Sequence, residues 1–181
     1  MRGGRAGARG RRFCLFAVVA VLVVAFDQVV KAWARAALVP GEPVTLIPGV
    51  MDLSLVYNTG AAFSLGEGAG WLFVGIAVAI TVGAVVFVAH ESSAPLALVV
   101  TLGCVAGGGI GNAIDRVVQG SVTDFFATTF VDFAVFNVAD IFITCGVVVA
   151  FLLWWHWDSA RAVGDEGGDA TSTPDAADSR H

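Results

Sequence analysis

The chain has 181 residues, of which 57% are hydrophobic and only 14% are charged, and its mean hydropathy is +0.81. This composition is far too apolar for a soluble domain and predicts an integral membrane protein. The length allows one compact helical bundle and excludes a separate soluble catalytic domain, so any chemistry has to be built on the bundle. The formal net charge of -5 arises mainly from acidic residues near the C-terminus.

A basic segment, 1–12, precedes the first apolar stretch, which runs from position 13 to about 37 and contains Asp27 and Lys31. The arginines of the basic segment place the N-terminus in the cytoplasm by the positive-inside rule. The alternative is a cleaved secretory signal peptide, because Ala32-Trp33-Ala34 is compatible with a cleavage site.

The next segment, at about 40–66, lacks the long apolar run of a membrane span and has a different pattern of apolar residues. Apolar and polar residues alternate from Val44 to Ile47 and from Met51 to Tyr57, around the turn pair Pro48-Gly49. This pattern predicts a short β-hairpin. In a chain whose N-terminus is inside, the hairpin lies on the outer surface of the membrane.

Three further apolar stretches, 70–89, 95–114 and 133–157, are each close to the roughly 20 residues that a helix needs to cross a bilayer. We therefore predict an all-α integral membrane protein with four transmembrane helices in residues 13–157 and a small β element on its outer face. Four crossings return the C-terminus to the cytoplasm. Residues 158–181 are acidic and poor in apolar side chains, so we expect a disordered cytoplasmic tail there.

The third stretch carries a small residue at every fourth position: Gly103, Gly107 and Gly111. In lipid, this spacing allows the backbone of a neighbouring helix to approach closely. A phosphate-binding loop is the alternative interpretation of these glycines. It is disfavoured because no Lys-Ser or Lys-Thr pair follows them.

Polar residues gather at one depth of the predicted bundle. With the N-terminus inside, every one of them lies near the outer interface, whereas the inner halves of the spans offer only threonines. Without a polar path across the membrane, a proton-coupled transporter or channel is disfavoured. The outer polar residues are Asp27, Lys31, Asn58, Asn112, Asp115, Arg116, Asp124, Asn137 and Asp140.

Some of these residues have a purely structural interpretation. Asp27 with Lys31, four residues apart, is compatible with an ion pair that anchors a helix end. Asp115 with Arg116 is compatible with a contact that holds the bundle together. Asp132 is expected to begin the fourth helix, where the helix dipole favours an acidic side chain.

Asp124 and Asp140 differ, because neither has a Lys or Arg nearby in sequence and a buried unpaired carboxylate is costly. We expect them to face each other. Two neighbouring carboxylates titrate as a unit, and one of them keeps a proton. Such a pair suits acid/base hydrolysis, in which one member activates water and the other donates to a carbonyl oxygen. The alternative is a non-enzymatic small membrane transporter, or a lipid-binding assembly factor whose charges bind headgroups.

The remaining reactive residue types predict no further chemistry. Cys14, Cys104 and Cys145 are isolated in apolar runs and are interpreted as small fillers. The histidines are scattered, so neither a metal site nor a cofactor is expected.

Five motifs in this order resemble the lipoprotein signal peptidase family, also called signal peptidase II, which consists of bacterial membrane aspartic peptidases. The resemblance covers about 11–157. Its motifs are Asp27-Gln28-Val29-Val30-Lys31, Asn58-Thr59-Gly60-Ala61-Ala62-Phe63, Gly107-Gly108-Gly109-Ile110-Gly111-Asn112-Ala113-Ile114-Asp115-Arg116, Val122-Thr123-Asp124-Phe125 and Phe136-Asn137-Val138-Ala139-Asp140.

The resemblance implies an endopeptidase that removes the signal peptide of prolipoproteins before a diacylglyceryl-modified cysteine. It implies a catalytic dyad of Asp124 and Asp140 that activates water. It also implies a location in the bacterial cytoplasmic membrane, with the active site at the outer face and no metal or cofactor. We expect a monomer that contacts membrane lipids and does not bind nucleic acid. The residues implied to bind substrate are Asn58, Asn112, Arg116 and Asn137, and those implied to support the site are Asp27, Lys31, Asp115 and Gly108.

Overall fold

The structure, a computed structural model, describes residues 2–60 and 69–169. Its helices are α1 (Arg2–Ala37), α2 (Gly70–His90), α3 (Leu96–Gln119) and α4 (Val138–Asp169). Each contains a stretch that is long and apolar enough to cross a membrane: Arg9–Ala37, Gly70–His90, Leu96–Gln119 and Val138–Ser159. The predicted four-span helical fold is confirmed.

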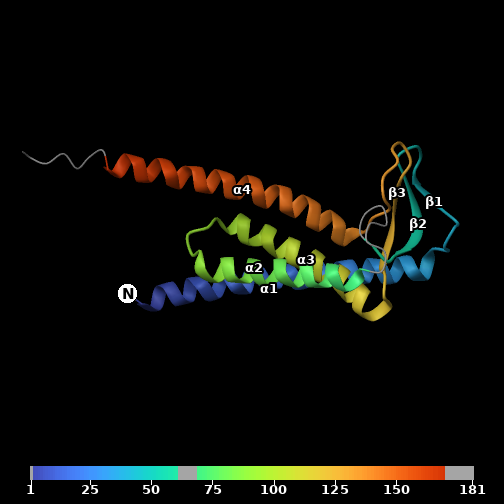
Figure 1. Ribbon diagram of the computed structural model, residues 1–181, viewed down its shortest axis with the longest axis horizontal. Coiled ribbons are helices and arrows are strands. Elements are labelled where there is room, and N and C mark those ends of the chain that lie inside the picture. The colour runs from blue at the N-terminus through green and yellow to red at the C-terminus, as the bar shows by residue number, and fades with distance from the viewer. Residues whose placement is uncertain (1, 61–68, 170–181) are drawn as a thin grey trace, which may run out of the picture.

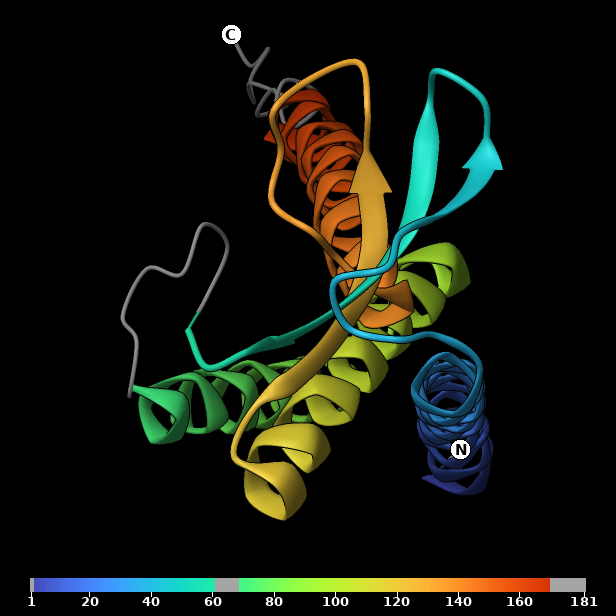
Figure 2. The same cartoon turned by 90° about the vertical axis from the view of Figure 1, so that its right-hand side faces the viewer.

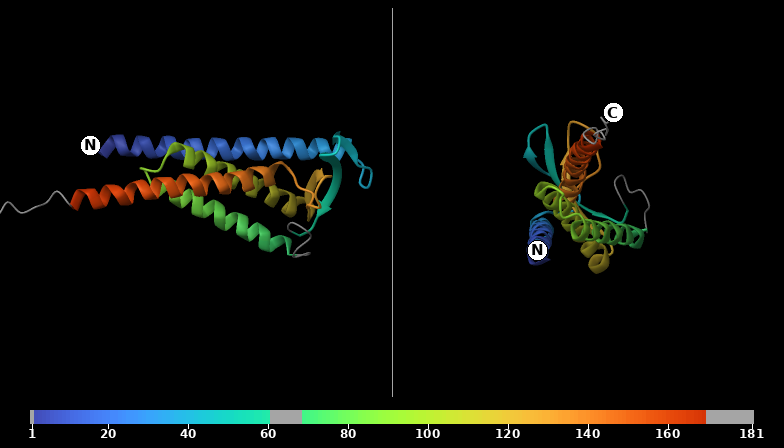
Figure 3. Two further views of the ribbon diagram at one scale, coloured as in Figure 1. Left: turned by 90° about the horizontal axis from the view of Figure 1, so that it is seen from above. Right: turned by 90° about the vertical axis from the view of Figure 1, so that its left-hand side faces the viewer.

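Helix α3 lies at the centre of the bundle. It contacts each of the other three helices and is the most buried of the four spans, and Figure 3 shows α1, α2 and α4 arranged around it. The N-terminal end of α1 and the C-terminal end of α4 lie at the same end of the bundle, opposite to the sheet (Figure 1). Asp27 and Lys31 lie in the second half of α1 and Asp140 lies in the first turn of α4, so these polar residues are at the sheet end.

Glycines on two faces of α3 explain its close packing. A Cβ atom at Gly107 would lie 2.7 Å from the Ala20 oxygen on α1, and one at Gly108 would lie 2.7 Å from the Ala139 oxygen on α4. Real Cβ contacts are essentially never this short, so any larger residue would push the helices apart. The helix-packing interpretation of the glycine spacing is confirmed, because the run lies inside α3 and not in a loop.

A three-stranded antiparallel sheet lies across the ends of the helices that are opposite the N-terminus, as Figure 2 shows from that end. Its order is β1 (Val44–Ile47), β2 (Met51–Asn58) and β3 (Val122–Thr128). Gly49 has a φ of 74° in the hairpin turn, a conformation that glycine adopts without strain. The predicted hairpin is confirmed, although the predicted element extends to 66 and part of it lies outside the described residues.

Strands β2 and β3 are fixed by packing on the helices. Leu53 and Leu55 of β2 and Phe125 of β3 are buried against Ala34 of α1 and Val138 of α4. Burying such side chains stabilises the fold by about 1.5–3 kcal/mol each. This cluster holds β3 directly above the first turn of α4.

Three expectations differ from the structure. Asp124 was expected in a loop, but it lies in β3, which pairs with β2 far away in sequence. The fourth helix was expected from 133, but it begins at Val138, so Asp132 lies outside it. The predicted acidic tail is helical up to Asp169, because α4 continues past the membrane-spanning stretch. Residues 170–181 lie outside the described residues.

Candidate active site

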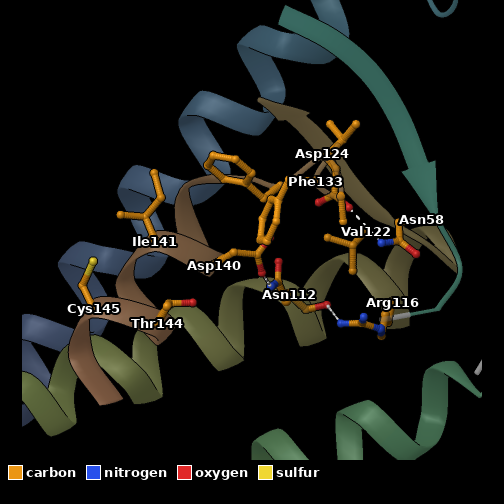
Figure 4. A pocket seen from close by; sticks show the side chains of 13 residues that line it. Asn58, Asn112, Arg116, Val122, Asp124, Phe133, Asp140, Ile141, Thr144 and Cys145 are labelled. Atoms are coloured by element: carbon orange, nitrogen blue, oxygen red, sulfur yellow. Dashed lines mark hydrogen bonds between the residues drawn. The ribbon is translucent and has the colours of Figure 1, made fainter. Parts of the chain in front are cut away.

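The two candidate catalytic aspartates lie on different elements and line one cavity. Asp124 projects from β3 and Asp140 from the first turn of α4. The cavity has a volume of about 380 Å³, and Figure 4 shows both carboxylates pointing into it. The two side chains that were expected to face each other thus line one common space.

The start of α4 is a capping box, and Asp140 is part of it. The Asn137 side chain accepts a hydrogen bond from the Asp140 backbone N–H at 3.1 Å, and the Asp140 carboxylate accepts one from the Asn137 N–H at 3.0 Å. This reciprocal arrangement satisfies two backbone donors that a helix start otherwise leaves unpaired. Asn137 is thus the N-cap residue just before α4, and the cap fixes the direction of the Asp140 carboxylate.

Side-chain amides hold both carboxylates. Asn137 donates to Asp124 Oδ1 at 2.6 Å, and Asn58 donates to Asp124 Oδ2 at 3.0 Å. Asn112 donates to Asp140 Oδ1 at 2.8 Å. Each carboxylate therefore receives two N–H donors, which orient it without supplying a positive charge.

Burial dominates the electrostatics of Asp124, whose side chain is only 3% exposed. Burial raises the pKa of this carboxyl from 3.8 to about 6. The hydrogen bond from Asn58 opposes the increase in pKa, whereas the charge of Asp140 adds to it. The hydrogen bond from Asn137 and the charge of Lys31 lower the pKa to smaller extents. A carboxyl with this pKa can hold a proton close to neutral pH.

A second polar layer lies beneath the aspartates and is completely buried. Lys31 Nζ lies 2.9 Å from Asp27 Oδ2 and 3.2 Å from Asp115 Oδ2, and all three side chains are 0% exposed. The Asp27–Lys31 ion pair is therefore confirmed. Asp115 pairs with Lys31 and not with Arg116, which corrects the expected Asp115–Arg116 contact among the described ion pairs.

Lys31 connects this buried layer to the cavity. Its ammonium donates to Asn112 Oδ1 at 2.7 Å, and the same oxygen accepts from Asn137 Nδ2 at 3.1 Å. With its oxygen held by these donors, Asn112 has to present its NH₂ group to Asp140. Asp27 adds a link, because its Oδ1 accepts the backbone N–H of Ala139 in the first turn of α4.

Sequence reasoning assigned no role to three residues that complete the buried layer. Gln28 donates to Asp27, to Asp115 and to the Gly111 carbonyl. Thr123 gives its backbone N–H to Asp115 and accepts a hydrogen bond from Arg35 at 2.9 Å. These contacts tie β3 to α1 and α3 at the residue next to Asp124. The available signal was adjacency, since Gln28 and Thr123 each flank a singled-out aspartate.

Arg116 lies at the edge of the cavity, on the α2 side. Its guanidinium donates to the Gly60 carbonyl at 2.8 Å and lies 5.0 Å from the centre of the Phe73 ring. These contacts leave it facing the same space as the two aspartates. Gly108 is not part of the cavity lining, and its role is to let α4 approach α3.

The arrangement suits one kind of chemistry. Two carboxylates with fixed directions face a common cavity, and at least one has a pKa that permits proton exchange near neutrality. A pair of this kind activates water and protonates a carbonyl oxygen. Within residues 2–60 and 69–169, no group of three His, Cys, Asp or Glu residues is placed to hold a metal ion.

Comparisons with known proteins agree with this geometry. A family profile described as Signal peptidase (SPase) II matches residues 19–156. Lipoprotein signal peptidases from Streptococcus pyogenes serotypes M6 and M1 are each 38% identical over 141 residues, which cover 78% of this chain and 93% of theirs.

Two solved structures described as bacterial membrane enzymes are also similar. One has a TM-score of 0.72 at 28% identity, and the match covers 91% of this chain and 94% of that structure's chain. The other has a TM-score of 0.69 at 32% identity, and the match covers 76% of this chain and 90% of that structure's chain. The chain therefore belongs to the signal peptidase II family of aspartic peptidases, whose members function as lipoprotein signal peptidases.

Proposed function

We propose that this chain cleaves prolipoproteins at the peptide bond before a diacylglyceryl-modified cysteine, with Asp124 and Asp140 as the catalytic dyad. The observation that carries the proposal is the placement of both carboxylates, from β3 and α4, in the lining of one cavity. The names of the streptococcal relatives support the substrate class. The cavity lies at the sheet end of the spans, where a membrane-anchored substrate would present its cleavage point.

In this mechanism Asp140 is the general base and Asp124 is the general acid. Asp140 is held by two N–H donors at the N-terminus of α4, where the helix dipole favours negative charge. It takes a proton from the attacking water. Asp124, whose pKa burial raises to about 6, donates a proton to the carbonyl oxygen as the tetrahedral intermediate forms. The C–N bond then breaks, as the proton taken by Asp140 passes to the leaving amine and a hydroxyl of the intermediate returns a proton to Asp124.

The surrounding polar residues have two roles in the proposal. Asn58, Asn112 and Arg116 bind substrate or orient the dyad from the cavity wall. Asn137, which is buried behind that wall, orients both aspartates. Asp27, Lys31 and Asp115 form the support beneath it, and Gly108 sets the helix spacing. The buried layer supports this division, because its side chains are closed to solvent while the cavity is open.

The orientation in the membrane is also a proposal. Arg9, Arg11 and Arg12 lie at the end of α1 opposite the sheet, and the positive-inside rule assigns that end to the cytoplasm. Both termini are then cytoplasmic and the cavity faces outward. The chain acts as a monomer in contact with lipid, because the described residues of one copy supply the whole polar network.

The test is cleavage of a lipidated prolipoprotein by the purified enzyme in lipid vesicles. Asp124→Asn and Asp140→Asn should each reduce kcat by more than about 10³-fold, since each removes one half of the acid/base pair. Asp132→Asn, which changes an aspartate outside the cavity, is the matched control and should cleave normally. Unchanged cleavage by either dyad variant, with the variant still folded, would refute the proposal.

A further inference from the structure

Three threonines lie within the membrane-spanning helices, and one differs from the other two. Thr81 donates its hydroxyl to the Ala77 carbonyl at 2.8 Å, and Thr101 donates to the Leu98 carbonyl at 3.0 Å. Both are typical of a threonine in a helix, whose hydroxyl donates a hydrogen bond to a backbone carbonyl of the preceding turn. Among the described residues, Thr144 makes no such bond and has no other acceptor for its hydroxyl.

Thr144 faces the candidate active site. It lies on α4 one turn after Asp140, and Figure 4 shows its side chain in the cavity wall next to Cys145. Four residues of helix place it about 6 Å further into the membrane than Asp140. Among the described residues that line the cavity, Thr144 carries the only hydroxyl.

The wall around Thr144 offers no replacement for a missing acceptor. Of the residues labelled near it in Figure 4, Ile141 is apolar and the Cys145 thiol is a weak partner. Among the described residues, Thr144 makes no hydrogen bond to the polar lining residues Asp140 and Asn112. A hydroxyl without a partner in apolar surroundings costs free energy, so this position favours a ligand that brings an acceptor. The contrast with Thr81 and Thr101 shows that the helical backbone itself is able to satisfy a threonine in this bundle.

A membrane-anchored substrate carries suitable acceptors at this depth. Its signal segment enters the site as an apolar helix, and the last four carbonyl groups of any helix have no partner within the helix. In lipid those carbonyls have to be satisfied by the protein. The bond to be cut lies at the dyad, so the unpaired carbonyls just before it lie about one turn deeper, level with Thr144.

From these observations we propose that the Thr144 hydroxyl donates a hydrogen bond to a carbonyl oxygen of the bound substrate. The inference rests on the proposed function and makes Thr144 a substrate-binding residue of the same site. The carbonyl belongs either to the signal-segment backbone or to an ester of the diacylglyceryl group, because both present the same acceptor. The hydrogen bond positions the bond to be cut against Asp124 and Asp140.

The test compares isosteric changes at two threonines. Thr144→Val keeps the shape and removes the hydroxyl, Thr144→Ser keeps the hydroxyl, and Thr101→Val makes the same change at a hydroxyl that bonds its own helix. Each purified variant cleaves a synthetic diacylglyceryl-peptide substrate in vesicles, and its melting temperature reports folding. Loss of one hydrogen bond predicts a kcat/KM about 5–10-fold lower for Thr144→Val. The decrease should arise mainly from KM, with Thr144→Ser within about twofold of the parent.

A second substrate with ether-linked chains, which lacks the ester carbonyls, locates the acceptor. If Thr144→Val loses as much kcat/KM on the ether substrate as on the ester substrate, the acceptor is a backbone carbonyl. If the loss disappears on the ether substrate, the acceptor is an ester. Both outcomes support the hydrogen bond.

The inference is overturned if Thr144→Val cleaves both substrates as well as Thr101→Val does. It is also overturned if Thr144→Ser loses as much activity as Thr144→Val, because shape and not the hydroxyl would then matter. Asp124→Asn separates this failure from a failure of the proposed function. A Thr144→Val enzyme with full activity, alongside an inactive Asp124→Asn enzyme, rejects only the role of Thr144.

Discussion

Two polar layers at the sheet end of the bundle each contain a pair of aspartates, and they differ in which groups contact the carboxylates. In the buried layer, Lys31 contacts both Asp27 and Asp115. In the cavity layer, amide groups of asparagines contact Asp124 and Asp140. The ammonium neutralises charge and fixes structure, whereas amides orient carboxylates and leave them free to exchange protons.

The comparison assigns stability to the first layer and reactivity to the second. A buried ion cluster is costly to break, because the charges left behind have no water to solvate them. A carboxylate pair without a cation keeps the tendency to share a proton that hydrolysis needs. Asn112 joins the two layers, since its oxygen is bound by Lys31 and its NH₂ group binds Asp140.

The largest expected effect is on stability, from Lys31→Met. This change leaves Asp27 and Asp115 buried without a cation and should lower the free energy of unfolding by about 3–5 kcal/mol. The double variant Asp27→Asn/Lys31→Met keeps the net charge of the cluster and should recover part of the loss. Thermal unfolding in detergent measures both. A Lys31→Met protein that is as stable as the parent would contradict the structural role of this layer.

A smaller loss of stability is expected from Gly111→Ala. The new Cβ would lie 2.5 Å from Asp27 Oδ2, an atom held by Lys31 and Gln28, so the site cannot relax easily. We expect a cost of about 1–3 kcal/mol, measured by thermal unfolding. Gly109→Ala is the matched control, because its Cβ would lie 3.5 Å from Ala77, an ordinary contact. Equal losses in the two variants would contradict the packing of the buried layer.

In the cavity layer, Asp124→Asn should increase stability in a pH-dependent way. Because folding raises the pKa of Asp124 from 3.8 to about 6, a charged Asp124 lowers the free energy of unfolding. This loss of stability is absent below pH 3.8 and complete above about pH 6. Removing the charge should therefore stabilise the protein at pH 7.5 by roughly 1–3 kcal/mol, and by much less at pH 4.5. Unfolding temperatures at the two pH values provide the measurement, and a gain independent of pH would argue against the burial effect.

The smallest expected effect is a change in pH dependence from Asn58→Ala. The hydrogen bond from Asn58 lowers the pKa of Asp124, so its loss raises that pKa further. If Asp124 acts as the acid, kcat/KM of the parent falls as pH rises through about 6, and this decline should move to higher pH in the variant. We also expect roughly a tenfold lower activity at the optimum. A profile that moves to lower pH would assign the acid role to the other aspartate.

Sequence patterns predicted the spans, the hairpin and the gathering of polar residues at one end of the bundle, because these follow from local hydropathy and periodicity. Strand β3 was not predicted, since its partner β2 lies far away in the chain and local alternation is weak in its buried first half. The start of α4 was placed too early because an apolar run such as Phe133 to Phe136 does not distinguish a helix from an extended segment. In the structure Phe136 instead pairs with Phe126 beside the sheet.

The site was predicted at the level of residues but not of contacts. Asp124 and Asp140 were expected to pair because neither has a cation nearby in sequence, and no ion pair to either of them occurs among the described residues. Asp115 pairs with Lys31 and not with the expected Arg116, because α1 packs against α3 and brings Lys31 close to it. Gln28 was assigned no role, because its position next to Asp27 does not show that its amide also reaches Asp115 on α3.

The most direct test of the paired carboxylates is a crystal structure with a substrate mimic that carries a tetrahedral hydroxyl in place of the carbonyl to be cut. The account predicts that this hydroxyl lies within hydrogen-bond reach, about 2.6–3.2 Å, of both Asp124 and Asp140. A complex in which the mimic fills the cavity while its hydroxyl contacts only one aspartate, or neither, would contradict the central claim.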